Sequence, residues 1–356
     1  MILAPLRGVT IRCFRETFAE VIRDAGFTEA ITPFIAAMPG YDPMRNEELR
    51  IKNEECAAVP QLSTPNSQHS TLNTQLSTLK VTPQFIGKDP EALRRCLERV
   101  KEFGYDTADL NCGCPYPMVR NKGRGSGILR TPDVLRRMLE VGCETMGPCK
   151  FSVKARLGVD RPDELLKLVP MINEFPLRFL TVHARTARQM YEGSCDVEMV
   201  ERVEKVAKVP IVFNGDVEFC GTALRGTDIL PVQTVAFVER ASRPFGLEDA
   251  GRTGETPVPH AGTPVPHAGT PVPQNGISVP QVMIGRSFVR YLGQRDDARE
   301  LLERYIAASR AELCGDRPVL GRMKELLAYW KDLPAWKRRW PVLKLCRSVD
   351  ELRAAI

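Results

Sequence analysis

Polar and reactive side chains stand at the ends of several short apolar runs in this chain. The segment DLNCGCP carries Asn111, Cys112 and Cys114, and VKARLG carries Lys154. A thiol in a Gly-Cys-Pro turn lies on a loop, where it can give up a proton or act as a nucleophile according to its pKa. Cys112 alternates with Cys114 and is expected to pack in the interior. The spacing therefore predicts Cys114 as the reactive thiol.

A second group of residues has the composition of a phosphate site. The residues of this group are Asn214, Gly215, Asp216, Gly285 and Arg286. The glycines let backbone N–H groups approach a phosphate, and the guanidinium of Arg286 can bind it as a fork. Lys154 could face an electron-rich ring atom at the other end of the same ligand, and neutral His183 could donate one hydrogen bond to it. The alternative is that both side chains pair with acids inside the fold.

The elements that must position these residues alternate along the sequence. Helical patterns separate most of the short apolar runs, which favours a parallel sheet with helices outside. The runs expected to be strands are residues 1–6, 29–35, 81–86, 107–111, 151–155, 179–183, 210–214 and 281–284. The helical patterns cover residues 14–25, 90–103, 132–141, 162–173 and 197–206. Eight such units predict an α/β fold, a (β/α)8 TIM barrel, whose working residues lie at the carboxyl ends of the strands.

A doubly wound open sheet is the alternative architecture. It predicts a glycine-rich turn after the first strand, but the chain has PLRGVT there. Gln84, Arg7, Arg156 and Arg185 also fall at strand ends. A later segment, residues 121–127, is glycine-rich and basic and is expected to be a flexible loop, although it lacks the GK[ST] ending of a phosphate-binding P-loop.

Two segments with a period of seven residues do not fit this alternation. They cover about residues 61–80, rich in Ser, Thr, Gln and Asn, and about 250–276, where GTPVPHA units place proline in every repeat. Proline forbids a helix, and neither segment offers the apolar seam of a coiled coil. We expect both to be disordered inserts in the barrel, or, for the proline-rich one, a ligand for a partner protein.

The segment after the barrel is helical and basic. Residues 297–313, 317–332 and 349–356 have helical patterns, and all three tryptophans lie between positions 330 and 340. The basic excess from Arg286 onward equals the net charge of +6 of the whole chain. Basic and aromatic residues together suit a nucleic-acid backbone and its bases. The alternative is a solvated helical face with the tryptophans packing a small helical domain.

Composition limits the classes of protein that remain. The chain has 356 residues, 43% of them apolar, without an apolar run near the roughly 20 residues that a bilayer requires. Its first residues lack the pattern of a signal peptide, and 11 cysteines without any CxxC pair favour reduced thiols over disulfides or structural zinc. We expect a cytoplasmic protein without a metal site.

Seven segments in order, with the spacing of a barrel, carry a family resemblance. They are APLRGVT, QFIG, DLNCGCP, VKARLG, TVHART, NGD and VMIGR. Together they resemble the tRNA-dihydrouridine synthases, and GRMKELLAYWKDL adds a weaker match. The resemblance implies an FMN-binding TIM barrel over residues 1–290 and a helical tRNA-binding domain over residues 291–356, in a monomer. The NCGCP motif leans towards the bacterial branch that acts on uridine 16 of the D-loop.

The resemblance also implies roles for individual residues. Cys114 corresponds to the catalytic cysteine, and Asn111 and Arg185 correspond to positions near the substrate. The flavin-binding residues implied by the resemblance are Pro5, Leu6, Gln84, Lys154, His183, Asn214, Gly215, Asp216, Gly285 and Arg286. The tRNA-binding residues implied in the helical domain are Lys324, Trp336, Lys337, Arg338 and Arg339. NADPH would reduce FMN, the flavin would give a hydride to C6 of a uridine, and Cys114 would protonate C5.

Some features depart from the family pattern and keep alternatives open. Leu6 stands where the family usually has Met, Arg7 where it has an acid or a small residue, and Pro33 where it usually has Glu. The proline-rich insert also lengthens the connection before the last strand. Two other functions are considered: an FMN barrel reductase of a free metabolite, and a repeat-damaged paralogue that binds tRNA without catalysis. The first predicts bound flavin without tRNA dependence, and the second predicts tRNA affinity without flavin.

Overall fold

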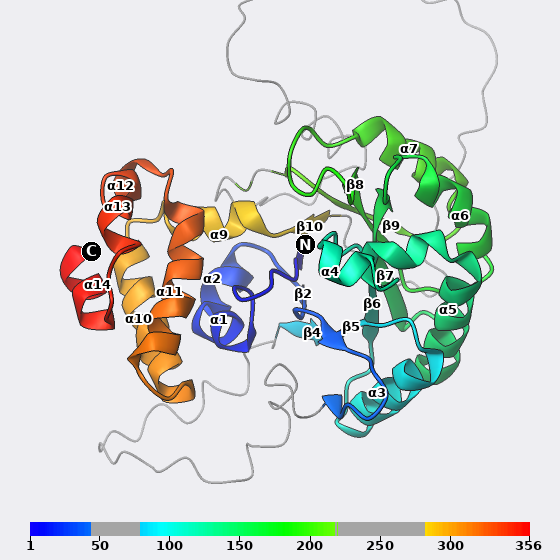
Figure 1. Ribbon diagram of the computed structural model, residues 1–356, viewed down its shortest axis with the longest axis horizontal. Helices are drawn as coiled ribbons and strands as arrows, with labels where there is room; N and C mark the ends of the chain where they lie inside the picture. Colours follow the sequence, from blue (N-terminus) through cyan, green and yellow to red (C-terminus); the bar gives the residue numbers. More distant parts are fainter. Residues whose placement is uncertain (44–78, 218, 220–281) are drawn as a thin grey trace, which may run out of the picture.

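The computed structural model describes residues 1–43, 79–217, 219 and 282–356 (Figure 1). Most of the first insert (residues 61–78) and all of the second (residues 250–276) lie outside the described residues. The first of the two inserts was placed at about residues 61–80, but Lys80 is already the first residue of strand β4. The predicted boundary after residue 290 falls inside helix α9, Arg286–Leu292.

The strands form one parallel sheet that closes on itself. Its strands follow the order β3-β5-β6-β7-β8-β9-β10-β1-β2-β4, and every pairing is parallel. Their bounds are β1 Ile2–Leu3, β2 Glu29–Ile31, β3 Ile35–Ala36, β4 Lys80–Thr82, β5 Gln84–Ile86, β6 Ala108–Cys112, β7 Phe151–Gly158, β8 Leu180–Thr186, β9 Ile211–Asn214 and β10 Val282–Ile284. All eight predicted strands are confirmed.

Ten strand segments make eight barrel strands because two of the strands are interrupted. Pro33 separates β2 from β3 and Pro83 separates β4 from β5, and a proline has no N–H to donate to a ladder. The two halves still pair with each other, β2 with β4 and β3 with β5. The side chain of Thr32 bridges the break by accepting the backbone N–H of Gln84 at 3.0 Å. The ring is therefore the closed (β/α)8 TIM barrel that the sequence predicts.

Helices cover the outside of the barrel strands on one side (Figure 1). They are α3 Pro90–Glu102, α5 Pro132–Met146, α6 Glu164–Ile172 and α7 Val197–Val206, with α1 Arg12–Thr17 and α2 Ala19–Asp24 after the first strand. Helix α3 shows why these segments are helical. Asp89 accepts the N–H of Ala92 at 3.0 Å, Pro90 occupies the first turn, and the apolar side chains at three- and four-residue spacing are buried.

The C-terminal helices pack on the same side of the barrel as α1 and α2. They are α10 Ala298–Glu312, α11 Asp316–Trp330, α12 Pro334–Lys337, α13 Trp340–Leu343 and α14 Val349–Ala355. Their apolar residues join those of α1, α2 and α9 in one continuous core. Trp330 is fully buried, and its indole N–H donates to the carbonyl of Val289 at 2.7 Å. The tryptophans thus join the helical part to the barrel. None of the described helices is long and apolar enough to cross a membrane.

Candidate active site

A cavity of about 400 Å³ opens at the carboxyl ends of the barrel strands. Eleven of the residues predicted for the site line it: Pro5, Leu6, Gln84, Asn111, Cys114, Lys154, His183, Asn214, Gly215, Gly285 and Arg286. They come from strands that are far apart in the sequence and from the loops after strands, and closure of the sheet brings them together. Further lining residues include Arg7, Pro33, Phe34, Arg156 and three tyrosines.

Cys114 is held in place by two sets of backbone hydrogen bonds. The side-chain oxygen of Asn111 accepts the N–H groups of Gly113 at 3.1 Å and Cys114 at 2.9 Å. On the other side, Ser126 donates its N–H and its hydroxyl to the carbonyl of Cys114, at 3.1 and 2.9 Å. Burial raises the pKa of the Cys114 thiol above its ordinary value, so the sulfur keeps its proton near neutral pH. The geometry suits a proton donor better than a thiolate nucleophile.

The glycine-rich segment predicted as a loop over residues 121–127 runs into a short helix at its end. Residues Gly125–Arg130 form a 3-10 helix in which Gly125–Leu129 are buried, and Gly125 has a φ of +56°. A Cβ atom at Gly125 would lie 2.7 Å from the Cβ of Cys114. The segment therefore supports the cysteine from behind, and its glycine is required by close packing rather than by a phosphate.

A chain of buried amide and carboxyl groups fixes the base of the cavity. Gln84 donates to Asp109 at 2.7 Å and accepts from Asn111 at 2.8 Å, so both ends of its amide are used. Ser152 donates to the other oxygen of Asp109 at 2.6 Å. Burial raises the pKa of Asp109 to about 6. Sequence reasoning missed this carboxylate and Ser152, although Asp109 stands in the DLNCGCP segment.

Lys154 and His183 face the cavity, and no Asp or Glu among the described residues lies at hydrogen-bond distance from either side chain. The ammonium group of Lys154 donates to the side-chain oxygen of Asn214 at 2.8 Å, and Asn214 donates to the carbonyl of Met283 at 2.9 Å. Burial, reinforced by the charge of Arg156, lowers the pKa of Lys154 to about 7. Burial and the surrounding cations lower the pKa of His183 well below its usual value, so this imidazole is neutral.

The charge of the cavity suits an anionic ligand. Its lining includes the cations Arg7, Lys154, Arg156 and Arg286, and none of the described lining residues is Asp or Glu. A buried amine whose pKa is depressed gains stability when an anion is placed beside it. The residues present therefore fit a phosphate-bearing cofactor with an electron-rich ring, as FMN is. Among the described residues, no group of three His, Cys, Asp or Glu side chains is placed to hold a metal ion.

Asp216 and Arg185 stand behind the cavity wall. Arg185 is 2% exposed, and its guanidinium donates to the carboxylate of Asp216 and to the carbonyl of Gly193 at 2.6 Å. Asp216 also pairs with Arg286 at 3.4 Å. Neither residue is among those that line the cavity: Arg185 holds the loop after β8 through the carbonyls of Glu192 and Gly193, and Asp216 links it to Arg286. A role for Arg185 near the substrate and for Asp216 near the flavin stays a prediction.

Aromatic residues at the mouth were missed in the sequence. Tyr191 lies beside two guanidinium groups, with Arg156 and Arg286 at 5.1 and 5.0 Å from its ring centroid. Arg156 is fixed by the carbonyls of Gly113, Thr186 and Met190. Tyr329 comes from α11 in the C-terminal part. Arg156 is two residues after Lys154 in the same strand, so the two side chains share a face, and the sequence had already placed Arg156 at a strand end, whereas nothing local marks Tyr329.

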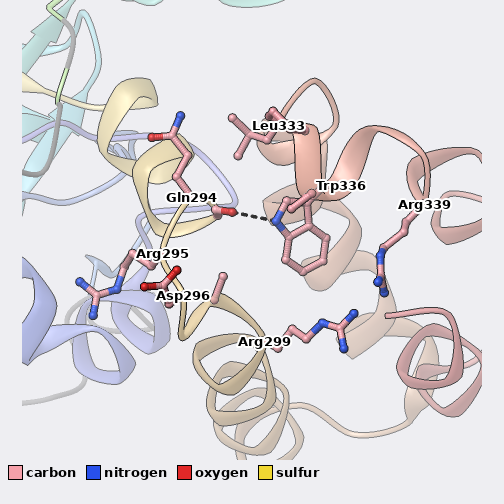
Figure 2. A pocket seen from close by; sticks show the side chains of 11 residues that line it. Gln294, Arg295, Asp296, Arg299, Leu333, Trp336 and Arg339 are labelled. Carbon is pink, nitrogen blue, oxygen red and sulfur yellow. Dashed lines mark hydrogen bonds between the residues drawn. The ribbon is translucent and has the colours of Figure 1, made fainter.

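The basic residues predicted to bind tRNA do not line this cavity. Lys324 donates to the carbonyls of Lys344 and Cys346, at 2.9 and 2.6 Å. Trp336 is 4% exposed, and its indole N–H donates to the carbonyl of Gly293 at 2.8 Å (Figure 2). Both side chains make contacts within the described structure, and their binding to tRNA stays a prediction. Lys337 and Arg338 are exposed and Arg339 is half-buried.

The comparisons with known proteins assign the family. The family model described as "Dihydrouridine synthase (Dus)" matches residues 2–245. The site is a buried thiol among cationic side chains at the mouth of a closed (β/α)8 barrel. The chain belongs to the dihydrouridine synthase family.

Individual relatives match over part of their length. "tRNA-dihydrouridine synthase B" of Vibrio cholerae serotype O1 is 25% identical over 61% of this chain and 60% of its own length. "tRNA-dihydrouridine(16) synthase" of Pseudomonas putida is 28% identical over 60% of this chain and 61% of its own. The match thus spans about three fifths of these curated relatives. Among solved structures, morphinone reductase superposes with a TM-score of 0.45 at 10% identity, covering 82% of each chain.

Proposed function

We propose that this protein is a flavin-dependent tRNA-dihydrouridine synthase, which reduces a D-loop uridine to 5,6-dihydrouridine with NADPH as the reductant and FMN as the cofactor. The observation that carries the proposal is the buried Cys114, held by Asn111 and Ser126 in a cavity that is lined by cations and, among the described residues, by no carboxylate. Family membership supports it. The names of the Vibrio and Pseudomonas relatives support tRNA as the substrate. We propose further that the enzyme is a cytoplasmic monomer.

The residues that would hold FMN are those of the cavity wall. Lys154 would bind the electron-rich edge of the ring system, and Arg286, with the backbone of Gly215 and Gly285, would bind the phosphate. Neutral His183 would donate a single hydrogen bond. When bound, FMN supplies hydride exchange between NADPH and C6 of the uracil ring.

The chain itself supplies the proton. The Cys114 thiol would donate its proton to C5 of the uracil, and its raised pKa keeps that proton available near neutral pH. Asn111 fixes the Gly113–Cys114 backbone and so sets the direction of the sulfur. The uridine must leave its stack to enter a cavity at this depth. We propose uridine 16 as the target, the position named for the Pseudomonas relative.

Anaerobic reoxidation of the NADPH-reduced protein by tRNA lacking dihydrouridine tests the proposal. The flavin absorbance should recover on mixing with tRNA and should not recover with free uridine. The Cys114→Ala variant should keep its flavin and its reduction by NADPH but lose the tRNA-dependent step by about 10²- to 10⁴-fold. Bound flavin that ignores tRNA would instead indicate a metabolite reductase, and tRNA binding without flavin would indicate a non-catalytic paralogue. Sequencing of the product tRNA locates the reduced uridine.

A further inference from the structure

Asp109 is a fully buried carboxylate that does not line the active-site cavity, and the proposed reaction does not use it. In the strand register, Asp109 of β6 lies opposite Gln84 of β5 on one side and opposite Ser152 of β7 on the other (Figure 1). Asn111 follows two residues later in β6, so its side chain lies on the same face of the sheet as that of Asp109. Three neighbouring strands therefore bring together one carboxylate, two amides and one hydroxyl.

The hydrogen bonds of this group all run in one direction, toward Asp109. The backbone N–H of Cys114 donates to the side-chain oxygen of Asn111 at 2.9 Å. The amide nitrogen of Asn111 donates to Gln84 at 2.8 Å, and the amide nitrogen of Gln84 donates to Asp109 at 2.7 Å. Ser152 donates to the second carboxylate oxygen at 2.6 Å. Asp109 is therefore the terminal acceptor of a chain of hydrogen bonds that begins at the backbone of Cys114.

The terminal acceptor decides how the two amides are oriented. An amide side chain can be turned over with almost no change of shape, so its partners determine which end points where. An ionised carboxylate accepts hydrogen bonds and donates none, which requires the NH2 end of Gln84 to face Asp109. The oxygen of Gln84 then accepts from Asn111, and the oxygen of Asn111 is left for the backbone of Cys114. Turning Gln84 over would place oxygen against oxygen at Asp109 and NH2 against NH2 at Asn111.

Hydrogen bonds keep the buried Asp109 mostly ionised above neutral pH. Burial raises its pKa to about 6, and the hydrogen bonds from Ser152 and Gln84 limit that rise. Loss of this acceptor would leave an N–H of Gln84, which is fully buried, without a partner. A buried donor without a partner is costly, so Gln84 would move toward a new acceptor and release Asn111.

We propose that Asp109 is a positioning residue for the Cys114 thiol. As the terminal acceptor it fixes the amides of Gln84 and Asn111, and these fix the turn that carries the sulfur. This inference rests on the proposed function, in which Cys114 gives a proton to the base. A proton donor must lie within hydrogen-bond reach of the atom that it protonates, so a small displacement of the turn slows the transfer.

A double-mutant cycle with Asn111 tests the proposal, with the reoxidation rate of the NADPH-reduced protein measured at saturating tRNA and above pH 7. Asp109→Leu should slow this step about 10- to 100-fold. Asn111→Ala should slow it as well, and the double variant should be no slower than Asn111→Ala alone, because Asp109 acts through Asn111. Flavin reduction by NADPH should stay near the wild-type rate in all three variants, since Cys114 takes no part in it.

Asp109→Asn separates the hydrogen-bond acceptor from the charge. Burial and the charge of Arg156 lower the pKa of Lys154 and the charge of Asp109 opposes this, so Asp109→Leu and Asp109→Asn both change the field at the lysine. The new amide can still accept from Gln84 and can donate to Ser152, so Asp109→Asn should recover most of the rate. Ser152→Ala is the matched control, because it removes a hydrogen bond from the same carboxylate but leaves the chain to Cys114 intact. Its reoxidation rate should stay near that of the wild type.

Alkylation of Cys114 by iodoacetamide is a second measurement, which needs neither flavin nor tRNA. The thiol is 7% exposed, so it should react slowly in the flavin-free wild type and in Asp109→Asn, and faster in Asp109→Leu. Peptide mass spectrometry separates Cys114 from the exposed Cys314. If Asp109→Leu does not fold, Gln84→Met breaks the same chain one link nearer to the sulfur and should give the same fast alkylation.

The outcomes separate this inference from the proposed function. Additive losses in the cycle, or wild-type alkylation of Cys114 in the variant that breaks the chain, would overturn the positioning role and leave the proposed function intact. An Asp109→Asn protein as slow as Asp109→Leu would assign the effect to charge and would also overturn it. A wild-type protein whose reduced flavin is not reoxidised by tRNA would overturn the proposed function, and with it this role of Asp109.

Discussion

Lys154→Met should stabilise the flavin-free protein while removing its ability to hold the flavin. The pKa of Lys154 falls from 10.5 to about 7, which at about 1.4 kcal/mol per pKa unit corresponds to about 5 kcal/mol of unfavourable free energy for the charged amine. The amine is half-buried in the cavity wall, where water still reaches it, and it loses a hydrogen bond to Asn214 on substitution. We therefore expect a net gain of about 1–3 kcal/mol in the free energy of unfolding at pH 7.

The pH dependence of stability follows from the direction of the Lys154 pKa shift. Below pH 7 the lysine is protonated in both the folded and the unfolded state, so the full penalty applies. Between pH 7 and 10.5 the unfolded state binds more protons, so wild-type stability rises with pH relative to the variant. Unfolding measurements made above pH 7 keep Asp109 mostly ionised in the folded protein, because its pKa is about 6.

Urea unfolding of the flavin-free proteins at half-unit steps from pH 7 to 9.5 measures the effect. The advantage of Lys154→Met should shrink steadily over this range. The same change at exposed Lys205 on α7 removes no buried charge and should give parallel curves. Wild-type and Lys154→Met curves that run parallel, or a variant less stable than the wild type at pH 7, would refute the assignment of Lys154 as a destabilised, ligand-binding amine.

Three further substitutions separate packing from binding. Trp336→Ala should lower the free energy of unfolding by about 3–5 kcal/mol in urea titrations, because the ring is buried; a change below about 1 kcal/mol would contradict its structural role. Gly125→Ala should displace Cys114 and reduce tRNA-dependent flavin reoxidation at least about tenfold, whereas Gly40→Ala, with φ of +74° and no atom within 4 Å of its Cβ, imposes similar strain and should not. Arg7→Ala, at an exposed position of the cavity mouth, should raise the KM for tRNA about tenfold with unchanged flavin content; an unchanged KM would show that Arg7 contacts no RNA.

Short-range signals in the sequence were sufficient to predict the barrel and most of the predicted residues that line its cavity. Apolar runs that end in a polar or reactive residue locate both a strand and its working end, and this pattern places Gln84, Cys114 and Lys154 correctly. It does not show where Arg185 lies, because a strand end does not state whether a long side chain lines the cavity. Here the half-buried carboxylate of Asp216, distant in sequence, accepts from the Arg185 guanidinium, and Arg185 is not among the lining residues.

Contacts between distant elements could not be predicted. The tryptophans have the composition of a base-stacking surface, yet Trp330 and Trp336 are used to join α11 and α12 to α9. A backbone carbonyl near the end of α9 accepts each indole N–H and so fixes the tryptophan in the interior. No local sequence pattern encodes the position of that carbonyl. Tyr329 enters the cavity for the same reason, since its position depends on how α11 packs against the barrel.

The core shared by the barrel and the C-terminal helices has a consequence for how a uridine would reach Cys114 in the proposed reaction. Tyr329 lines the cavity from α11, and Glu325 of the same helix lies so close to Gly8 that a Cβ atom there would collide with its carboxylate. Behind these contacts, the helical part and α1, α2 and α9 bury one apolar cluster. Swinging α11 away would expose that cluster to water, at about 25 cal/mol for each Å² of apolar surface. We therefore expect a mouth of fixed shape, and in the proposed reaction the base would have to come out of the RNA stack to enter it.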